Sequence, residues 1–272
     1  MAKQAVTTEY TVSSDKVKSA LRIALAADIH ERKQEDVLEL LKQAKPDLIA
    51  VAGDTMERFD TESRLLIGKR KMSRLHRLFL STAFMVNYFF VQIIGRNNHP
   101  ETENAYHFIR EASKLAPVYL SLGNHEEKLL EEDLTLFRES GVVLLDNSGA
   151  EADINGVFLH IGGLSTFFDE QWLESFSQIE GFKLLLCHHP EYYDELLSNK
   201  DIDLILSGHN HGGQIRLFGK RMFSAGGGLF PKYVHGLYHD RLVVSAGCSN
   251  TVAIPRLGNP RELVIINIIP KN

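Results

Sequence analysis

The sequence has only two cysteines, Cys187 and Cys248, in 272 residues. Two cysteines cannot build a disulfide scaffold and neither lies in a Cys-x-x-Cys motif, so a reducing compartment is the simpler setting. Residues 1–10 contain no apolar segment of signal-peptide length and no small-residue cleavage pattern. We therefore expect a cytoplasmic protein that is not exported.

An excess of positive charge is also absent, since the net charge is −5 and the isoelectric point is about 6.2. Such a chain has no overall basic field for nucleic acid, and we expect no nucleic-acid partner. Internal repeats and low-complexity linkers are absent as well, which predicts one domain over residues 1–272.

Five apolar runs are each followed at once by polar residues that can bind a metal. The runs cover 21–27, 47–52, 117–122, 183–186 and 203–207, and they have the length and composition of buried strands. The polar residues after them are, in chain order, Asp28 with His30, Asp54, Asn124 with His125, His188, and His209 with His211. Because open α/β sheets bind ligands at the carboxyl ends of their strands, we expect these residues to meet at one edge.

Helices are predicted between these strands at 35–45, 102–115 and 127–139, and one more near Trp172. In the third helix, Leu129, Leu130, Leu134 and Phe137 are expected to face the core. Shorter strands follow at 142–145, 157–161, 214–218, 241–245 and 262–269. The most economical fold is α/β, a four-layer α/β/β/α sandwich of two mixed sheets packed face to face with helices outside.

The donor set consists of carboxylates, an amide oxygen and imidazoles. A lone histidine is more often a surface or packing residue, but five motifs of one form need a common explanation. Asp28 and His30 are two residues apart at a strand end, where alternate side chains point the same way, so they can chelate one cation. Mixed nitrogen and oxygen donors suit Mn²⁺, Fe²⁺ or Zn²⁺ better than Ca²⁺, which prefers oxygen alone.

In this order the motifs Asp-x-His, Gly-Asp, Gly-Asn-His-Glu, His and Gly-His-x-His resemble those of the calcineurin-like metallophosphoesterase superfamily. The resemblance covers nearly the whole chain and implies two divalent metal ions. It implies that one metal is held by Asp28, His30 and His211, and the second by Asn124, His188 and His209, with Asp54 bridging them. His188 and His189 compete for one ligand position, which the family's His-x-Pro pattern assigns to His188.

The same resemblance implies hydrolysis of a phosphodiester or pyrophosphate bond. A hydroxide that bridges the metals would attack phosphorus, and His125, which is not a ligand, would protonate the leaving alkoxide. The motifs 208–215, 233–238, 245–247 and 255–262 look like those of the bacterial branch that includes UDP-2,3-diacylglucosamine pyrophosphatases. This implies a lipid-linked or membrane-proximal substrate. A soluble nucleotide is the alternative substrate, and a non-catalytic scaffold is the alternative class.

Residues 56–98 interrupt the alternation of strands and helices and predict a helical insertion. Arg70, Arg74 and Arg77 fall on one helical face, and residues 78–95 are uncharged and rich in aromatics. A single membrane crossing is excluded, because it would put Asp54 and Asn124 on opposite sides of the bilayer. A buried or dimer-forming helix, a lid or interfacial anchor at 69–95, and a re-entrant loop remain open. The anchor would place the protein at the inner face of the membrane; the oligomeric state is left open.

Overall fold

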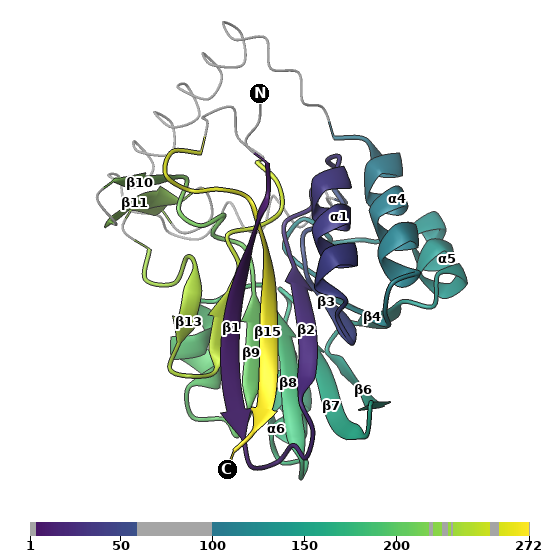
Figure 1. The fold of residues 1–272 in the computed structure, drawn as a ribbon, viewed down its shortest axis with the longest axis vertical. Helices are drawn as coiled ribbons and strands as arrows, with labels where there is room; N and C mark the ends of the chain where they lie inside the picture. The colour runs from purple at the N-terminus through teal and green to yellow at the C-terminus, as the bar shows by residue number, and fades with distance from the viewer. Residues whose placement is uncertain are drawn as a thin grey trace, which may run out of the picture.

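The computed structural model describes residues 4–58, 100–217, 220–224, 228–229, 231–250 and 256–271. Two six-stranded mixed sheets form its centre, and helices cover their outer faces (Figure 1). The predicted four-layer sandwich of two mixed sheets is confirmed. The predicted insertion at 56–98 lies almost wholly outside the described residues.

The first sheet has the strand order β1-β15-β2-β3-β4-β5, and all neighbours are parallel except β15 and β2. Its strands are β1 (Val6–Ser14), β2 (Leu21–Ala26), β3 (Leu48–Ala52), β4 (Val118–Ser121), β5 (Val143–Leu145) and β15 (Glu262–Pro270). Strands β2, β3 and β4 are almost entirely buried because the second sheet packs on one face and helices pack on the other.

The second sheet has the order β13-β14-β9-β8-β7-β6, with a parallel centre and antiparallel strands at both edges. Its strands are β6 (Ser148–Ile154), β7 (Val157–Leu164), β8 (Phe182–Cys187), β9 (Leu204–Ser207), β13 (Gly236–Tyr238) and β14 (Leu242–Val244). A small third sheet contains β10 (Ile215–Leu217), β11 (Lys220–Ser224) and β12 (Gly228–Leu229).

Three apolar layers hold these elements together. The layer between the two sheets includes Ile23, Leu184 and Ile266. A second layer joins the first sheet to the helices α1 (Glu35–Ala44), α4 (Thr102–Ser113) and α5 (Glu131–Glu139). A third layer joins the second sheet to α6 (Glu170–Ser177) and the short π-helix η1 (Tyr193–Leu197).

The prediction for residues 127–139 was wrong in the start of the helix and in part of its buried face, although Phe137 is buried as predicted. The helix α5 begins only at Glu131, because the backbone N–H groups of Glu127 and Lys128 bond the Arg58 carbonyl instead of continuing a helix. Leu130 is therefore exposed, and Leu136 takes the buried position that was assigned to Leu134.

Strand β1 has no counterpart in the predicted elements. It pairs in parallel with β15 over nine residues at the edge of the first sheet. Only one of its faces is covered, so its sequence mixes Thr and Glu with Tyr10 and Val12, which pack toward the core. An edge strand of this kind lacks the continuous apolar run by which the central strands were recognised.

Candidate metal centre

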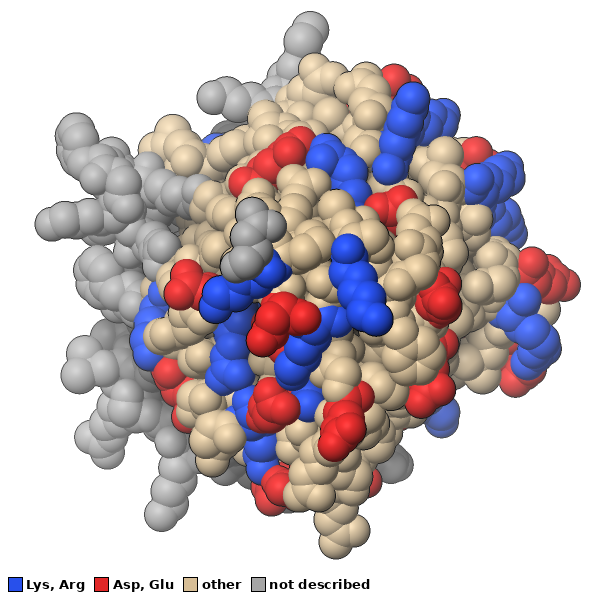
Figure 2. Space-filling model, turned by 60° about the horizontal axis from the view of Figure 1, so that its bottom comes forward, with Lys and Arg blue, Asp and Glu red and all other residues tan. Residues whose placement is uncertain are grey.

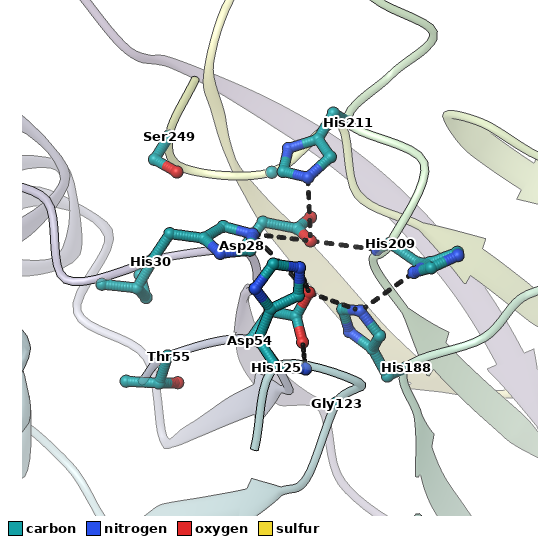
Figure 3. Close-up of polar contacts among 12 residues, drawn as sticks. Asp28, His30, Asp54, Thr55, Gly123, His125, His188, His209, His211 and Ser249 are labelled. Carbon is teal, nitrogen blue, oxygen red and sulfur yellow. Dashed lines mark hydrogen bonds and ion pairs between the residues drawn. The ribbon is translucent and has the colours of Figure 1, made fainter. Parts of the chain in front are cut away.

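The loops after β2, β3, β4, β8 and β9 contain all eight predicted site residues. Seven of these residues, all but Asn124, are labelled in Figure 3, where their side chains gather at one edge of the sandwich. Strands β2 to β4 belong to the first sheet, whereas β8 and β9 belong to the second. The prediction that the polar residues gather at the carboxyl ends of the strands is therefore met in space, and both sheets contribute.

Asp28, His30 and His211 form a first cluster of ligand atoms within 4.8 Å of one another. The Asp28 Oδ1 atom lies 3.9 Å from His30 Nε2 and 3.8 Å from His211 Nε2. All three residues are buried. Three donors at these separations can converge on one cation at ordinary metal–ligand distances of about 2 Å.

Asp54, His188 and His209 form a second cluster. Asp54 Oδ2 lies 3.0 Å from His188 Nε2 and 3.6 Å from His30 Nε2, so this carboxylate faces both clusters. His209 Nδ1 lies 3.3 Å from His188 Nε2. Asp54 thus occupies the position between the two clusters that a bridging carboxylate needs.

Asn124 lies beside the second cluster, between Gly123 and His125. The backbone N–H of His125 donates to Asp54 Oδ1 at 2.9 Å. The Asn124 Oδ1 atom is buried and has no hydrogen-bond partner among the described residues. Its free lone pairs are thus available to a cation.

Left-handed backbone, rather than strand alternation, orients the ligand side chains. Asp28, His30, Asp54, His209 and His211 all have positive φ, between 44° and 72°. The expectation that Asp28 and His30 share a face because they continue strand β2 was wrong, since the strand ends at Ala26. L-amino acids rarely adopt a positive φ, and residues that do so concentrate at functional sites.

Two glycines keep the loops close enough to form the site. A Cβ atom added at Gly53, whose φ is +79°, would lie 2.7 Å from His188 Nδ1. A Cβ atom at Gly123 would lie 2.1 Å from Asp54 Oδ1. The Gly-Asp and Gly-Asn-His motifs therefore need glycine for a steric reason.

The Glu126 carboxylate joins the loop after β3 to the loop after β4 through hydrogen bonds. It accepts hydrogen bonds from the backbone N–H groups of Asp54, Thr55, Met56 and Gly123 at 2.7–3.0 Å. The carboxylate is buried, and its four donors satisfy it fully. The glutamate of the Gly-Asn-His-Glu motif thus supports the site without facing it.

The buried charges strongly affect one another. Burial opposes ionisation of Asp54, but the His188 imidazole, with His125 and His30, lowers the pKa of this carboxyl well below its usual range. Burial also opposes protonation of His188, but Asp54 raises the pKa of this imidazole to about 10. A proton and a metal cation compete for the lone pairs of such a pair, so metal binding here is coupled to proton release.

Two further imidazoles, those of His209 and His211, are held neutral. Burial, together with the neighbouring His189 and His188, lowers the pKa of His209 to about 3. Burial also lowers the pKa of His211 to about 3. Both rings therefore offer an unprotonated nitrogen at neutral pH, as a metal ligand must.

Glu57 belongs to the site although the sequence did not point to it. Its Oε1 lies 2.8 Å from His30 Nδ1 and its Oε2 lies 2.8 Å from His125 Nδ1. Burial opposes ionisation, but hydrogen bonds from His125 and His30 lower the pKa of Glu57 to about 2. The sequence signal for Glu57 was an acidic residue three positions after the Gly-Asp motif. Single acidic residues at such a distance from a motif are too common to identify a site residue.

His125 lies beside the two clusters and is more exposed than their histidines, with 28% of its side chain accessible against 12% for His209 and 7% for His211. Burial opposes its protonation, but the hydrogen bond with Glu57 and the Asp54 charge raise the pKa of His125. Its Nε2 lies 3.8 Å from Asp54 Oδ2, so this nitrogen faces the centre while Nδ1 is held by Glu57.

His188 and His189 point in different directions. The His188 Nδ1–H donates to the Ala52 carbonyl at 2.8 Å, which leaves Nε2 toward Asp54. His189 turns away toward Thr166 and Glu191, at 3.0 and 3.1 Å. The geometry therefore brings His188 into the cluster, as the sequence motif predicts.

A family model described as calcineurin-like phosphoesterase matches residues 21–213. The chain belongs to this family, and it is a metal-dependent phosphoesterase. The matched segment contains all eight predicted site residues and Glu57.

Similarity to whole relatives extends beyond residues 21–213. The uncharacterized protein YpbG of Bacillus subtilis is 27% identical over 95% of this chain and 85% of its own length. An uncharacterized metallophosphoesterase of Aquifex aeolicus is 25% identical over 96% of this chain and 90% of its own. The solved structure of the sulfate thiohydrolase SoxB of Thermus thermophilus has 11% identity and a TM-score of 0.45, and covers 96% of this chain and 57% of that one.

On the face shown in Figure 2, Lys and Arg side chains alternate with Asp and Glu, and neither sign forms a separate patch there. None of the described helices is long and apolar enough to cross a membrane. The predicted absence of a nucleic-acid partner and the predicted membrane contact both stay predictions.

Proposed function

We propose that the chain is a dinuclear phosphoesterase that hydrolyses a phosphodiester or pyrophosphate bond. Asp54 would lie between the two cations. The remaining ligands would be Asp28, His30 and His211 for the first cation and Asn124, His188 and His209 for the second. This mixed oxygen and nitrogen donor set suits Mn²⁺, Fe²⁺ or Zn²⁺.

One observation carries this proposal. Asp28 Oδ2, His30 Nε2 and Asn124 Oδ1 are buried and have no hydrogen-bond partner among the described residues. An unsatisfied buried polar group costs about 1–3 kcal/mol, and proteins rarely gather several of them. All three atoms belong to the five motifs, so cations at this edge would satisfy them together.

The chain's own residues would supply orientation and a proton. When bound, the two cations would provide Lewis-acid polarisation of the phosphoryl group and an activated water. Glu57 is an anion and holds His125 by Nδ1, so the protonated ring presents Nε2–H toward the centre. His125 can therefore donate a proton to the leaving oxygen, and its partial exposure lets a substrate reach it.

We further propose that the substrate is lipid-linked or membrane-proximal. Two exposed apolar side chains support this: Phe167, which is 58% exposed and follows Thr166, a contact of His189, and Leu257, which is 56% exposed. Phe167 follows β7, and Leu257 follows Arg256, whose guanidinium lies 3.4 Å from His211 Nδ1. The resemblance to the lipid-pyrophosphatase branch points the same way, whereas a soluble nucleotide is the alternative substrate.

Metal analysis combined with turnover of bis-p-nitrophenyl phosphate tests the first proposal. We expect about two equivalents of divalent metal per chain and loss of turnover on chelation, restored by Mn²⁺. Fewer than two equivalents after reconstitution would refute the dinuclear centre, and metal without diester turnover would favour a scaffold.

Vesicle flotation tests the substrate proposal. We expect the protein to float with vesicles that contain anionic lipid. Failure to float, together with efficient turnover of a soluble nucleotide diester, would favour the soluble alternative.

A further inference from the structure

A second carboxylate lies beside His209, whereas Glu57 contacts His30 and His125. Glu191 Oε1 lies 3.1 Å from His189 Nδ1 and 3.8 Å from His209 Nε2. These three residues form a compact group whose nitrogen and oxygen atoms lie within 4.8 Å of one another. Neither His189 nor Glu191 has a role in the chemistry proposed above.

The orientation of His209 decides what Glu191 can do. His209 Nδ1 faces the second cluster, 3.3 Å from His188 Nε2. The opposite nitrogen, Nε2, faces Glu191. A neutral imidazole has one protonated nitrogen, so a ring that offers the Nδ1 lone pair to a cation must carry its proton on Nε2. The Glu191 carboxylate lies 3.8 Å from this nitrogen, too far for a direct hydrogen bond but close enough for its charge to favour a proton there.

His189 holds Glu191 in place for this contact. Its Nδ1 lies against the carboxylate, and its Nε2 lies 3.0 Å from Thr166 Oγ1. The ring also stacks on Tyr192, with centroids 4.9 Å apart and an interplanar angle of 29°. His189 is buried, so its ring and the Thr166 contact form a fixed support beside the site.

We propose that Glu191 is a positioning residue for the second cation. Its negative charge beside His209 Nε2 favours the tautomer that carries the proton there and presents Nδ1 to the metal, and the contact with His189 fixes the carboxylate. This inference rests on the proposed dinuclear function, in which His209 is a ligand. Carboxylates that bond a metal-bound histidine typically change metal affinity by 10–100-fold.

Loss of Glu191 should change the metal affinity by an amount toward the lower end of that range. The reason is that 47% of the Glu191 side chain is exposed, so water weakens its electrostatic effect on His209. Titration of the metal-free protein with Co²⁺, followed by absorbance, reports each equivalent separately from catalysis. In Glu191→Ala we expect the first equivalent to bind as in the wild type and the second about tenfold more weakly. Glu191→Gln should give an intermediate affinity for the second equivalent, because the amide keeps a dipole beside His209 but loses the charge.

The matched control is Glu195→Ala, which removes an exposed carboxylate four residues away that has no contact with the site. It should titrate like the wild type, and both variants should have the wild-type melting temperature without metal. At saturating metal, Glu191→Ala should recover most of its kcat.

Three results would overturn the inference. The first is normal binding of the second equivalent in Glu191→Ala, and the second is an equal loss in the control. The third is an extra Co²⁺ equivalent in the wild type that Glu191→Ala abolishes, which would make Glu191 a ligand of a separate site. If the wild type itself binds fewer than two equivalents, the dinuclear proposal fails instead.

Discussion

The His188 Nε2 atom lies 3.0 Å from Asp54 Oδ2, and the contact joins the two sheets of the sandwich. Asp54 follows β3 of the first sheet, whereas His188 follows β8 of the second. The second cluster therefore exists only when the two sheets pack face to face. Loss of charge at Asp54 should act on both metals and on the contact between the sheets.

Asp54→Asn should lower metal content to one equivalent or less and reduce diester turnover at least about 100-fold, because the carboxylate between the clusters loses its charge. Elemental analysis and a bis-p-nitrophenyl phosphate assay measure both effects. Asp15→Asn, at an exposed turn, is the control and should change neither. Two metals retained at full occupancy in Asp54→Asn would argue against a bridge.

His125→Ala should leave the metals bound but slow turnover by about 10²–10⁴-fold for substrates with poor leaving groups, because the proton donor is lost. An activated aryl ester needs little protonation and should be affected much less. The measurement compares kcat for a nitrophenyl ester and an alkyl ester in both proteins. An equal loss for the two esters would contradict a general acid at this position.

Asp133→Asn should lower the free energy of unfolding by about 1–3 kcal/mol at neutral pH, because it removes the charge that bonds Arg58 and leaves Glu31 as the partner of the guanidinium. The two Asp133 oxygens bond Arg58 Nε and Nη2 at 2.7 and 2.8 Å, and Tyr106 donates at 2.8 Å. Urea unfolding of both proteins measures the difference. Glu132→Gln, exposed on the same helix, should cost little.

The contact between Asp133 and Arg58 should also make the free energy of unfolding depend on pH. Burial opposes ionisation of Asp133, but its bonds with Arg58, Leu130 N–H and Tyr106 lower the pKa of the folded carboxyl below its unfolded value. A lowered folded pKa contributes stability above the unfolded pKa of about 4 and loses it as the pH falls through the folded value. The difference in free energy of unfolding between the wild type and Asp133→Asn should therefore become smaller below about pH 4. A difference that stays the same there would contradict a lowered pKa for Asp133.

Replacing Arg70, Arg74 and Arg77 by Gln should weaken binding to anionic vesicles in a salt-dependent way, by about 1 kcal/mol per arginine. This expectation comes from the sequence, because all three positions lie outside the described residues. Hydrolysis of a small soluble diester should stay nearly unchanged, since none of the three is a proposed ligand. Loss of folding or a new oligomeric state without any change in vesicle binding would make the segment structural.

Much of the fold followed from local patterns. The apolar runs that became β2, β3, β4, β8 and β9 were recognisable because strands covered on both faces need continuous apolar sequence. Strand β1 is covered on one face only, and its boundary and pairing came from β15, more than 250 residues later in the chain. The start of α5 was misplaced for a similar reason, since the Arg58 carbonyl takes the N–H groups that would have extended it.

The sequence by itself determined which side chains could meet at the edge of the sheets, because motif order and residue type settle the donor set. Only the tertiary structure decided how they face one another. Three features depend on how loops from the two sheets pack against one another. They are the positive φ of Asp28 and His30, the steric need for glycine at position 53, and the orientation of His189 away from His188. Glu57 and Glu191 became visible for the same reason: a carboxylate that orients histidines is defined by distance in space, and no spacing in the chain encodes it.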